Sequence, residues 1–333
     1  MMNMFVEALE PILIDHCTTA DVRRIEAKAS GHSLFQKIAD AGFLELLAEE
    51  SDGGAGISTH ELFPVLFLLG QYAVPLPIAQ TIAARWLWKN HASIPKGLIA
   101  FAPHHSIKDE MLICANVPMG RVSQYVVIED QQVLKVFNCA EAIHAEDSGI
   151  QGSLLTTFKW NIDAGQSFEM KKTPTDLMSL SASLKAIELA ASIKKVFDMT
   201  LQYANDRVQF GKSIGKFQAI QHQLSVMAEH VAAASIAVQA AFDLDSGPPV
   251  RLQSAIAKSR TSESAQLIAA TAHAVHGAIG ITYEYDLQIY TRRMHHARMA
   301  YGSESYWNQW IGEQVLASQT TQLSDFIQMT SSP

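Results

Sequence analysis

Mostly apolar residues recur at helical spacing through the second half of the chain. In a first segment the repeated positions are four and three residues apart in turn: Ala186, Ala190, Ile193, Phe197, Thr200 and Ala204. In a second segment the same steps continue through Phe217, Ile220, Leu224, Met227, Val231, Ala234, Val238 and Ala241. Each set lies along one face of a long helix that packs lengthwise on other helices. Because only the short loop 210–216 joins the two, we expect them to be antiparallel helices of a bundle.

Breaks and changes of pattern divide the rest of the chain. A third helix is expected over about 250–275, after a stop at Gly247-Pro248-Pro249. Residues 126–128 and 133–137 are apolar and flank the polar residues 129–132, which predicts a strand, a turn and a strand. A further strand is expected over 154–160.

The first part of the chain has a helical pattern, with breaks at 52–56 and around Pro75 and Pro77. We therefore predict a mainly α fold with a small inserted β domain. The expected domains are an N-terminal helical domain (1–98), a small β domain (99–175) and a C-terminal helical bundle (176–333).

Composition narrows the functional classes. The 333 residues are 48% hydrophobic and carry a net charge of −8, without any long basic run, which argues against nucleic acid as the main partner. Three widely spaced cysteines and the absence of a CxxC or HExxH pattern argue against a disulfide framework and a zinc site. The N-terminus lacks the pattern of a signal peptide, and the apolar stretch 62–70 is too short to span a bilayer. We expect a cytoplasmic protein that does not enter a membrane.

A few residues could carry chemistry. The sequence Gly211-Lys212-Ser213 lacks the first glycine of a Walker loop and follows a helix, so we reject a phosphate loop there. His273 and His276 have metal-ligand spacing without a third ligand, and we interpret them as helix-end histidines. Arg207 followed by Gln209 and Phe210 could hold a phosphate and stack on a flat ring, although such a trio is more often ordinary loop packing.

Four segments resemble the acyl-CoA dehydrogenase family, and they occur along this chain in the order in which the family has them. The first and most specific is YANDRVQFGKSIGKFQAIQHQL at 203–224, and the second is HGAIGITYEYDLQIYTRR at 276–293. FQKIADAGFLELLAEESDGGAGIS at 35–58 resembles the helical N-terminal domain of the family, and VPMGRVSQYVVIED at 117–130 resembles part of its β domain. The resemblance implies a C-terminal four-helix bundle, FAD bound between subunits, and α,β-dehydrogenation of an acyl-CoA thioester.

The resemblance also assigns roles to residues. The positions that would contact the diphosphate and adenosine part of FAD are Arg207, Gln209, Phe210, Phe217 and Gln218. Gly277 would let the backbone approach a cofactor that is bound mainly by a neighbouring subunit. Ala274 and Ala278 depart from the glutamine and glycine that are usual in the family at this turn.

The position of the catalytic glutamate is the main departure from the family pattern. It falls at Tyr301, and the alternative position on an earlier helix falls at Ser181. Glu188 and Glu304 lie near these two places but out of register. The Thr-Glu-Pro and Gly-Ser-Asp runs that usually bind the flavin are also absent from the β domain.

This pattern resembles the short, base-lacking subunits of heteromeric α2β2 bacterial steroid acyl-CoA dehydrogenases, in which a second subunit carries the glutamate. Two alternatives stay open. One is a complete homo-oligomeric enzyme with a relocated base such as Glu304. The other is a helical assembly scaffold that has lost FAD.

Overall fold

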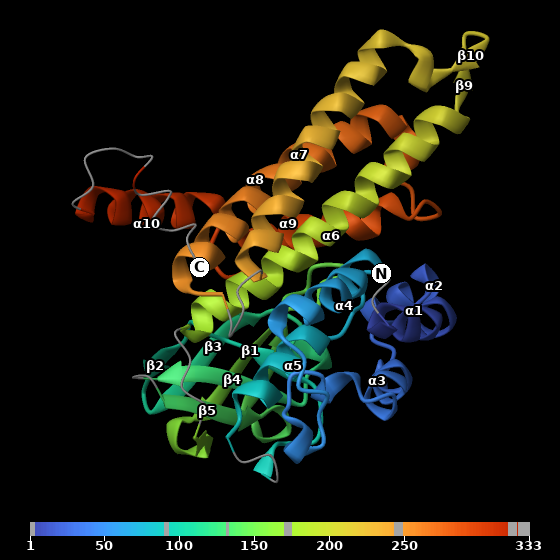
Figure 1. Cartoon of the computed structure of the whole chain (residues 1–333). Coiled ribbons are helices and arrows are strands. Elements are labelled where there is room, and N and C mark those ends of the chain that lie inside the picture. Colours follow the sequence, from blue (N-terminus) through green and yellow to red (C-terminus); the bar gives the residue numbers. More distant parts are fainter. Residues whose placement is uncertain are drawn as a thin grey trace.

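Helices fill the first part of the chain. The computed structural model describes residues 4–89, 93–130, 133–169, 175–242 and 249–318, together with Asp325. The N-terminal helices are α1 (Met4–His16), α2 (Thr19–Glu26), α3 (His32–Asp40), α4 (Thr59–Gln71) and α5 (Ile78–Leu87), as Figure 1 shows. Two of them begin at capping boxes, in which Thr18 and Asp21, or Ser58 and Glu61, exchange side-chain and backbone hydrogen bonds. The break predicted at 52–56 lies between α3 and α4.

Two four-stranded sheets follow α5. The strands are β1 (Ile99–Phe101), β2 (Ser106–Lys108), β3 (Met111–Val117), β4 (Tyr125–Asp130), β5 (Val133–Asn138), β6 (His144–Asp147), β7 (Thr156–Asn161) and β8 (Gln166–Phe168). Their orders are β1-β4-β5-β8 and β2-β3-β7-β6; in the described part of the chain β1 and β4 pair in parallel and the other neighbours in these sheets pair antiparallel. The expected hairpin is the antiparallel pair β4 and β5; the residues 131–132 of its turn lie outside the described residues.

Successive side chains of β4 point to opposite faces of its sheet, one toward the second sheet and one toward the helices. Val126 and Ile128 point into the core between the two sheets, which also contains Phe137 and Trp160. Val127, between them, joins the core shared with the helices. One strand therefore packs on both sides, and its run of β-branched residues reflects burial on two faces.

Long helices form the last part of the chain. They are α6 (Leu177–Asp206), α7 (Gln218–Phe242), α8 (Arg251–His276), α9 (Leu287–Met299) and α10 (Glu304–Ala317). Figure 1 shows α6 to α9 packed lengthwise and α10 projecting from one end of this bundle. Asp176 begins α6 by accepting a hydrogen bond of 2.7 Å from the amide of Ser179. The predicted fold class is confirmed, whereas the division into three domains stays a prediction, and Gly247 and Pro248 lie outside the described residues.

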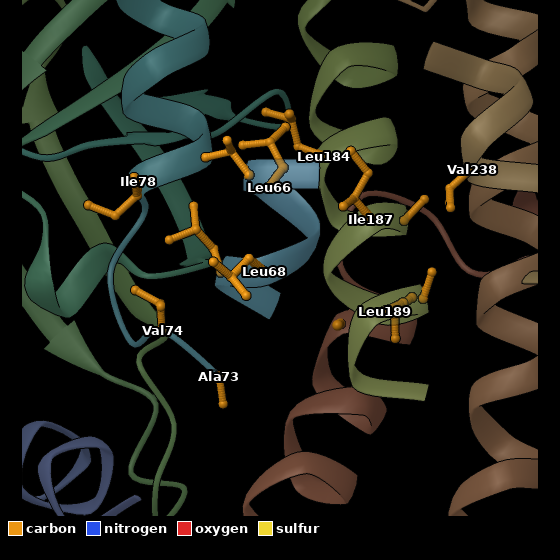
Figure 2. Packing of buried hydrophobic residues seen from close by; sticks show 14 of the residues in the cluster. Leu66, Leu68, Ala73, Val74, Ile78, Leu184, Ile187, Leu189 and Val238 are labelled. Carbon is orange, nitrogen blue, oxygen red and sulfur yellow. The ribbon is translucent and has the colours of Figure 1, made fainter. Parts of the chain in front are cut away.

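The main core joins the N-terminal helices to the bundle. Figure 2 shows Leu66 of α4 beside Leu184 of α6, and Leu68 and Ile187 belong to the same cluster of buried residues. Gly70 permits this approach, because a Cβ there would lie 2.6 Å from the Ala191 side chain. The α4–α6 contact fixes where α6 starts relative to the sheets.

The helix α7 is buried along one face only. Its buried residues, which match the predicted seam, include Leu224, Met227, Val231, Ala234 and Val238. By length and composition alone α7 could cross a membrane, and 28% of its most apolar window is buried. The sequence reading missed this property because it considered only the uninterrupted apolar run at 62–70. A single helix of this kind is weak evidence for a membrane span. The partial burial of α7 leaves an open apolar face that includes Ile236, which is 65% exposed.

Candidate functional site

A β-hairpin joins α6 to α7 at the end of the bundle farthest from the two sheets (Figure 1). Its strands are β9 (Val208–Gln209) and β10 (Lys212–Ser213), which pair in antiparallel register. The two turn residues, Phe210 and Gly211, have φ angles of 52° and 81°, as in a type I′ turn. This geometry leaves the ring of Phe210 92% exposed to solvent.

Three polar residues of the resemblance are available at this hairpin. Arg207 directly follows α6 and is exposed, and its side chain makes no hydrogen bond or ion pair with the described residues. Gln209 and Gln218 are also exposed. An unpaired guanidinium beside an exposed aromatic ring suits an anionic ligand that has a flat ring, such as a nucleotide diphosphate.

Phe217 supports the hairpin rather than lying open. It is half-buried, and its ring packs edge-on against Phe210 with centroids 6.2 Å apart. The Lys212 ammonium lies 4.3 Å from the centre of the same ring. In this chain, Phe217 therefore holds the ring of Phe210 in its outward position.

Gly277 ends α8 at the same end of the bundle. Its φ of 63° and ψ of −145° belong to a region that is almost exclusive to glycine. A Cβ at Gly277 would meet no atom within 4 Å, so the backbone is open to a ligand. The short 3₁₀ helix η8 (Gly277–Ile281) follows, and both Ala274 and Ala278 are exposed on this surface.

Three aromatic residues connect the hairpin to this turn. The rings of Tyr203 and His276 stack with centroids 4.4 Å apart, and Tyr285 lies 5.1 Å from the His276 ring. His276 is buried, and this burial lowers its pKa. The sequence reading placed His276 at a helix end, which is correct, but spacing along the chain could not show its contacts with α6 and the 282–286 loop.

Tyr301, at the expected position of the catalytic base, is buried between the bundle and the sheets. Its hydroxyl donates a hydrogen bond of 3.0 Å to the carbonyl of Phe101 in β1. Its own carbonyl accepts a bond of 2.9 Å from the Trp307 indole. Burial raises the pKa of Tyr301 above its usual value, so the hydroxyl keeps its proton and cannot act as a base.

The alternative position is equally unsuited. The Ser181 hydroxyl is buried and donates to the Leu177 carbonyl at 2.6 Å. Two turns further along α6, Glu188 pairs with the buried ammonium of Lys185. Glu188 lines two adjacent cavities of about 50 and 30 Å³. These volumes suffice for a few water molecules, whereas binding pockets for drug-sized ligands have several hundred Å³.

Glu304 is held in an ion pair at the start of α10. Both of its oxygens accept from Arg298, and the Nε contact is 2.9 Å. This contact lowers the pKa of Glu304, which weakens it as a base. Next to it, the fully buried Lys258 donates to Ser262 and to the carbonyls of Arg298, at the end of α9, and Gly302, and burial lowers its pKa to about 7. The sequence reading missed Lys258, since an isolated lysine in an α-helix gives no signal of burial.

The candidate cofactor residues and the position of the base lie at opposite ends of the same helix. Tyr301 packs in one cluster with Met178 and Ala182 near the start of α6, and Arg207 follows its last residue. Arg207 follows Ser181 by 26 positions, which correspond to about 39 Å at the helical rise of roughly 1.5 Å per residue. Among the described residues, no group of three His, Cys, Asp or Glu side chains could hold a metal ion.

Comparisons with known proteins agree with this geometry. Residues 178–316 match the family model for the acyl-CoA dehydrogenase C-terminal domain. Acyl-CoA dehydrogenase IpdE2 of Mycobacterium tuberculosis is 27% identical over 88% of this chain and 90% of that protein. The IpdE2 of Mycolicibacterium smegmatis is 34% identical, but over only 36% of this chain and 37% of that protein.

A solved structure shares the fold. One chain of the ChsE4–ChsE5 complex from Mycobacterium tuberculosis superposes with a TM-score of 0.76 and 19% identity, over 94% of this chain and 96% of that one. Residues 178–316 thus correspond to the C-terminal domain of acyl-CoA dehydrogenases, and the similarity to IpdE2 extends over most of the chain. Its expected enzyme class, an acyl-CoA dehydrogenase among the oxidoreductases, is supported by these relatives.

Proposed function

We propose that this chain is one subunit of a heteromeric, FAD-dependent acyl-CoA dehydrogenase whose partner subunit carries the catalytic glutamate. The observation that supports it most is the length of α6 between the two sites. The hairpin at Arg207 lies about 39 Å along the helix from the place where a base would act, at roughly 1.5 Å per residue. Residues so far apart do not line one compact catalytic centre within a single chain, so the hairpin would serve the site of a neighbouring subunit, and the missing carboxylate makes that neighbour a different chain.

The hairpin and the Gly277 turn fit the diphosphate and adenosine part of FAD. Arg207 is free to neutralise a phosphate, Phe210 offers an open ring face, and Gly277 lets the backbone come close. When bound, FAD would accept a hydride from the β carbon of the thioester. This chain would bind and orient that cofactor in the partner's site.

Proton removal from the α carbon is assigned to the partner. Tyr301 is a buried donor, and Glu304 is tied to Arg298. A general base accelerates such a step by about 10²–10⁴-fold, and it needs an available carboxylate. The pairing of Glu304 counts against a homo-oligomer with a relocated base, and the open hairpin counts against a flavin-free scaffold.

The open face of α7 supports an oligomer, because an uncovered apolar helix is stabilised when another subunit covers it. ChsE4–ChsE5 of Mycobacterium tuberculosis, one chain of which shares this fold, is itself a complex. Steroid thioesters are the acyl substrates that we propose, on the resemblance to steroid acyl-CoA dehydrogenases.

Coexpression with the longer acyl-CoA dehydrogenase-like subunit tests the assignment. Replacing the partner's glutamate by glutamine should abolish flavin reduction by substrate. Glu304→Gln and Glu188→Gln should each leave turnover within about threefold, which is below the loss expected for a general base. A hundredfold loss in Glu304→Gln, with FAD content and thermal midpoint unchanged, would show that this chain owns its base.

The cofactor contact is tested separately. Arg207→Ala should weaken FAD binding by about one to two decades, the effect of losing one charge-assisted contact of roughly 1.5–3 kcal/mol. Lys108→Ala, at an exposed position on β2, is the matched control for the loss of one positive charge. Equal FAD affinity in the wild type and Arg207→Ala would remove the hairpin from the cofactor site.

A further inference from the structure

The hairpin and the Gly277 turn are joined by a short chain of contacts. The amide of Arg207 donates to the carbonyl of Tyr203 at 2.8 Å, one turn earlier in α6. The Tyr203 ring stacks on His276, and its hydroxyl lies 3.4 Å from the His276 carbonyl. Since His276 immediately precedes Gly277, one stacked pair connects both elements that face the cofactor.

Hydrogen bonds define the state of the His276 ring. Nδ1 lies 2.8 Å from the Ala272 carbonyl, which can only accept, so Nδ1 carries the proton. Nε2 of the neutral ring is then an acceptor, and the Tyr285 hydroxyl lies 3.2 Å from it. The imidazole thus receives a hydrogen bond from the loop while it stacks on α6.

Helix α2 anchors the loop that carries Tyr285. One nitrogen of the Arg23 guanidinium donates to the Tyr283 carbonyl at 2.9 Å and to the Asp286 carboxylate at 2.7 Å. The same guanidinium lies 5.0 Å from the centre of the Tyr283 ring. Arg23 therefore contacts the loop on both sides of Tyr285, which restricts where the tyrosine hydroxyl can lie.

We propose that His276 and Tyr285 are positioning residues, which fix the spacing between the Arg207 hairpin and the Gly277 turn and so set the affinity for FAD. Neither needs to touch the cofactor. The proposal rests on the proposed function, because it assumes that these two elements contact FAD. Without the contacts of His276 and Tyr285, the Arg207 hairpin and the Gly277 turn could move apart. The cofactor would then contact only one of these two elements at a time.

The test uses the complex with the partner subunit, stripped of FAD and titrated with FAD by flavin fluorescence. His276→Phe keeps a ring for stacking and removes both hydrogen bonds, and Tyr285→Phe removes only the hydroxyl. Each should weaken FAD binding about 3–10-fold, the scale of one neutral hydrogen bond. The double variant should bind FAD as well as the single variant with the lower affinity, because both changes break the same hydrogen bond between His276 and Tyr285.

Controls separate positioning from general damage. Tyr72→Phe removes a similar hydroxyl contact, 3.2 Å from Glu10, and should leave FAD affinity unchanged. Wild-type affinity in both His276→Phe and Tyr285→Phe would overturn the proposal, as would effects that multiply in the double variant. If His276→Phe does not fold, Tyr285→Phe alone decides.

Arg207→Ala in the same assay distinguishes two kinds of failure. If Arg207→Ala binds FAD like the wild type, the proposed function itself fails. If Arg207→Ala weakens FAD binding and neither His276→Phe nor Tyr285→Phe does, only the positioning role fails. Weakened binding in all three supports both.

The pH profile is a readout that a purely structural role would not change. A protonated Nε2 cannot accept a hydrogen bond from Tyr285. The FAD affinity of the wild type should therefore fall as the pH drops below 6.5 towards the lowered pKa of His276. The FAD affinity of His276→Phe should depend less on pH. The groups that face the His276–Tyr285 pair are Tyr203 and Asp206 on α6, His273 on α8 and Asp286 in the loop. Parallel profiles in the wild type and His276→Phe would overturn the proposal.

Discussion

Lys258 gives the sharpest prediction for stability. Its ammonium is fully buried and donates to Ser262 Oγ at 2.8 Å and to the carbonyls of Arg298 at 2.8 Å and Gly302 at 2.7 Å. Charged side chains of α6, α9 and α10 surround it: Lys185, Glu188, Arg298 and Glu304. Burial lowers the pKa of Lys258 to about 7, from 10.5 for an exposed lysine.

The sign of the effect follows from proton binding. Between pH 7 and 10.5 the unfolded chain keeps a proton on Lys258 that the folded protein has released. The contribution of Lys258 to stability is therefore fully present above pH 10.5 and is lost as the pH falls to 7. At about 1.4 kcal/mol per pH unit, the free energy of unfolding should rise by roughly 2 kcal/mol between pH 7.5 and 9 because of this residue.

Lys258→Met isolates this term. Urea unfolding of the wild type and the variant at pH 7.5 and 9 should show the rise of about 2 kcal/mol only in the wild type. Lys108→Met, at an exposed position on β2, should keep the wild-type profile. Parallel profiles for the wild type and Lys258→Met would refute the reasoning, and would show that the three acceptors hold the proton on the ammonium.

Three further substitutions probe the contacts between domains and the turn. Tyr301→Phe leaves the β1 carbonyl without its donor and should cost about 1–3 kcal/mol of unfolding free energy in urea titrations. Gly277→Ala should cost about 1–3 kcal/mol through backbone strain and should lower the flavin content of the purified complex. Glu26→Gln removes the buried carboxylate that pairs with the half-buried guanidinium groups of Arg292 and Arg293, so a loss of up to about 3 kcal/mol is expected by calorimetry. A thermal midpoint unchanged in Glu26→Gln would show that these pairs add no net stability.

Periodicity was most informative where one face of an element is buried along its whole length. The seam from Leu224 to Val238 is buried as predicted because every third or fourth residue of α7 packs on the neighbouring helices. The hairpin of β4 and β5 was visible for a similar reason, since a polar turn separates two apolar runs. Short strands such as β2, which is exposed at all three residues, carry no such pattern.

The candidate site was only partly accessible from the sequence. The resemblance indicated Arg207 and Gly277, and the structure places them after the last residues of α6 and α8, which lie next to each other. The partners of His276 could not be found in this way, because Tyr203 is 73 residues away and spacing along a chain says nothing about such contacts. The burial of Lys258 was hidden for the same reason, since its acceptors are 40 and 44 residues further on.

The 30 residues of α6 have a consequence for how such a chain can evolve. Changes near Ser181 and Tyr301 that remove a carboxylate act at one end of the helix, and the surface around Arg207 lies at the other end. Selection on the two ends is therefore nearly independent, because substitutions so far apart rarely affect each other's energetics. After a gene duplication, one copy could lose its catalytic base step by step and still be retained, because its surface around Arg207 would continue to serve the site of the other copy.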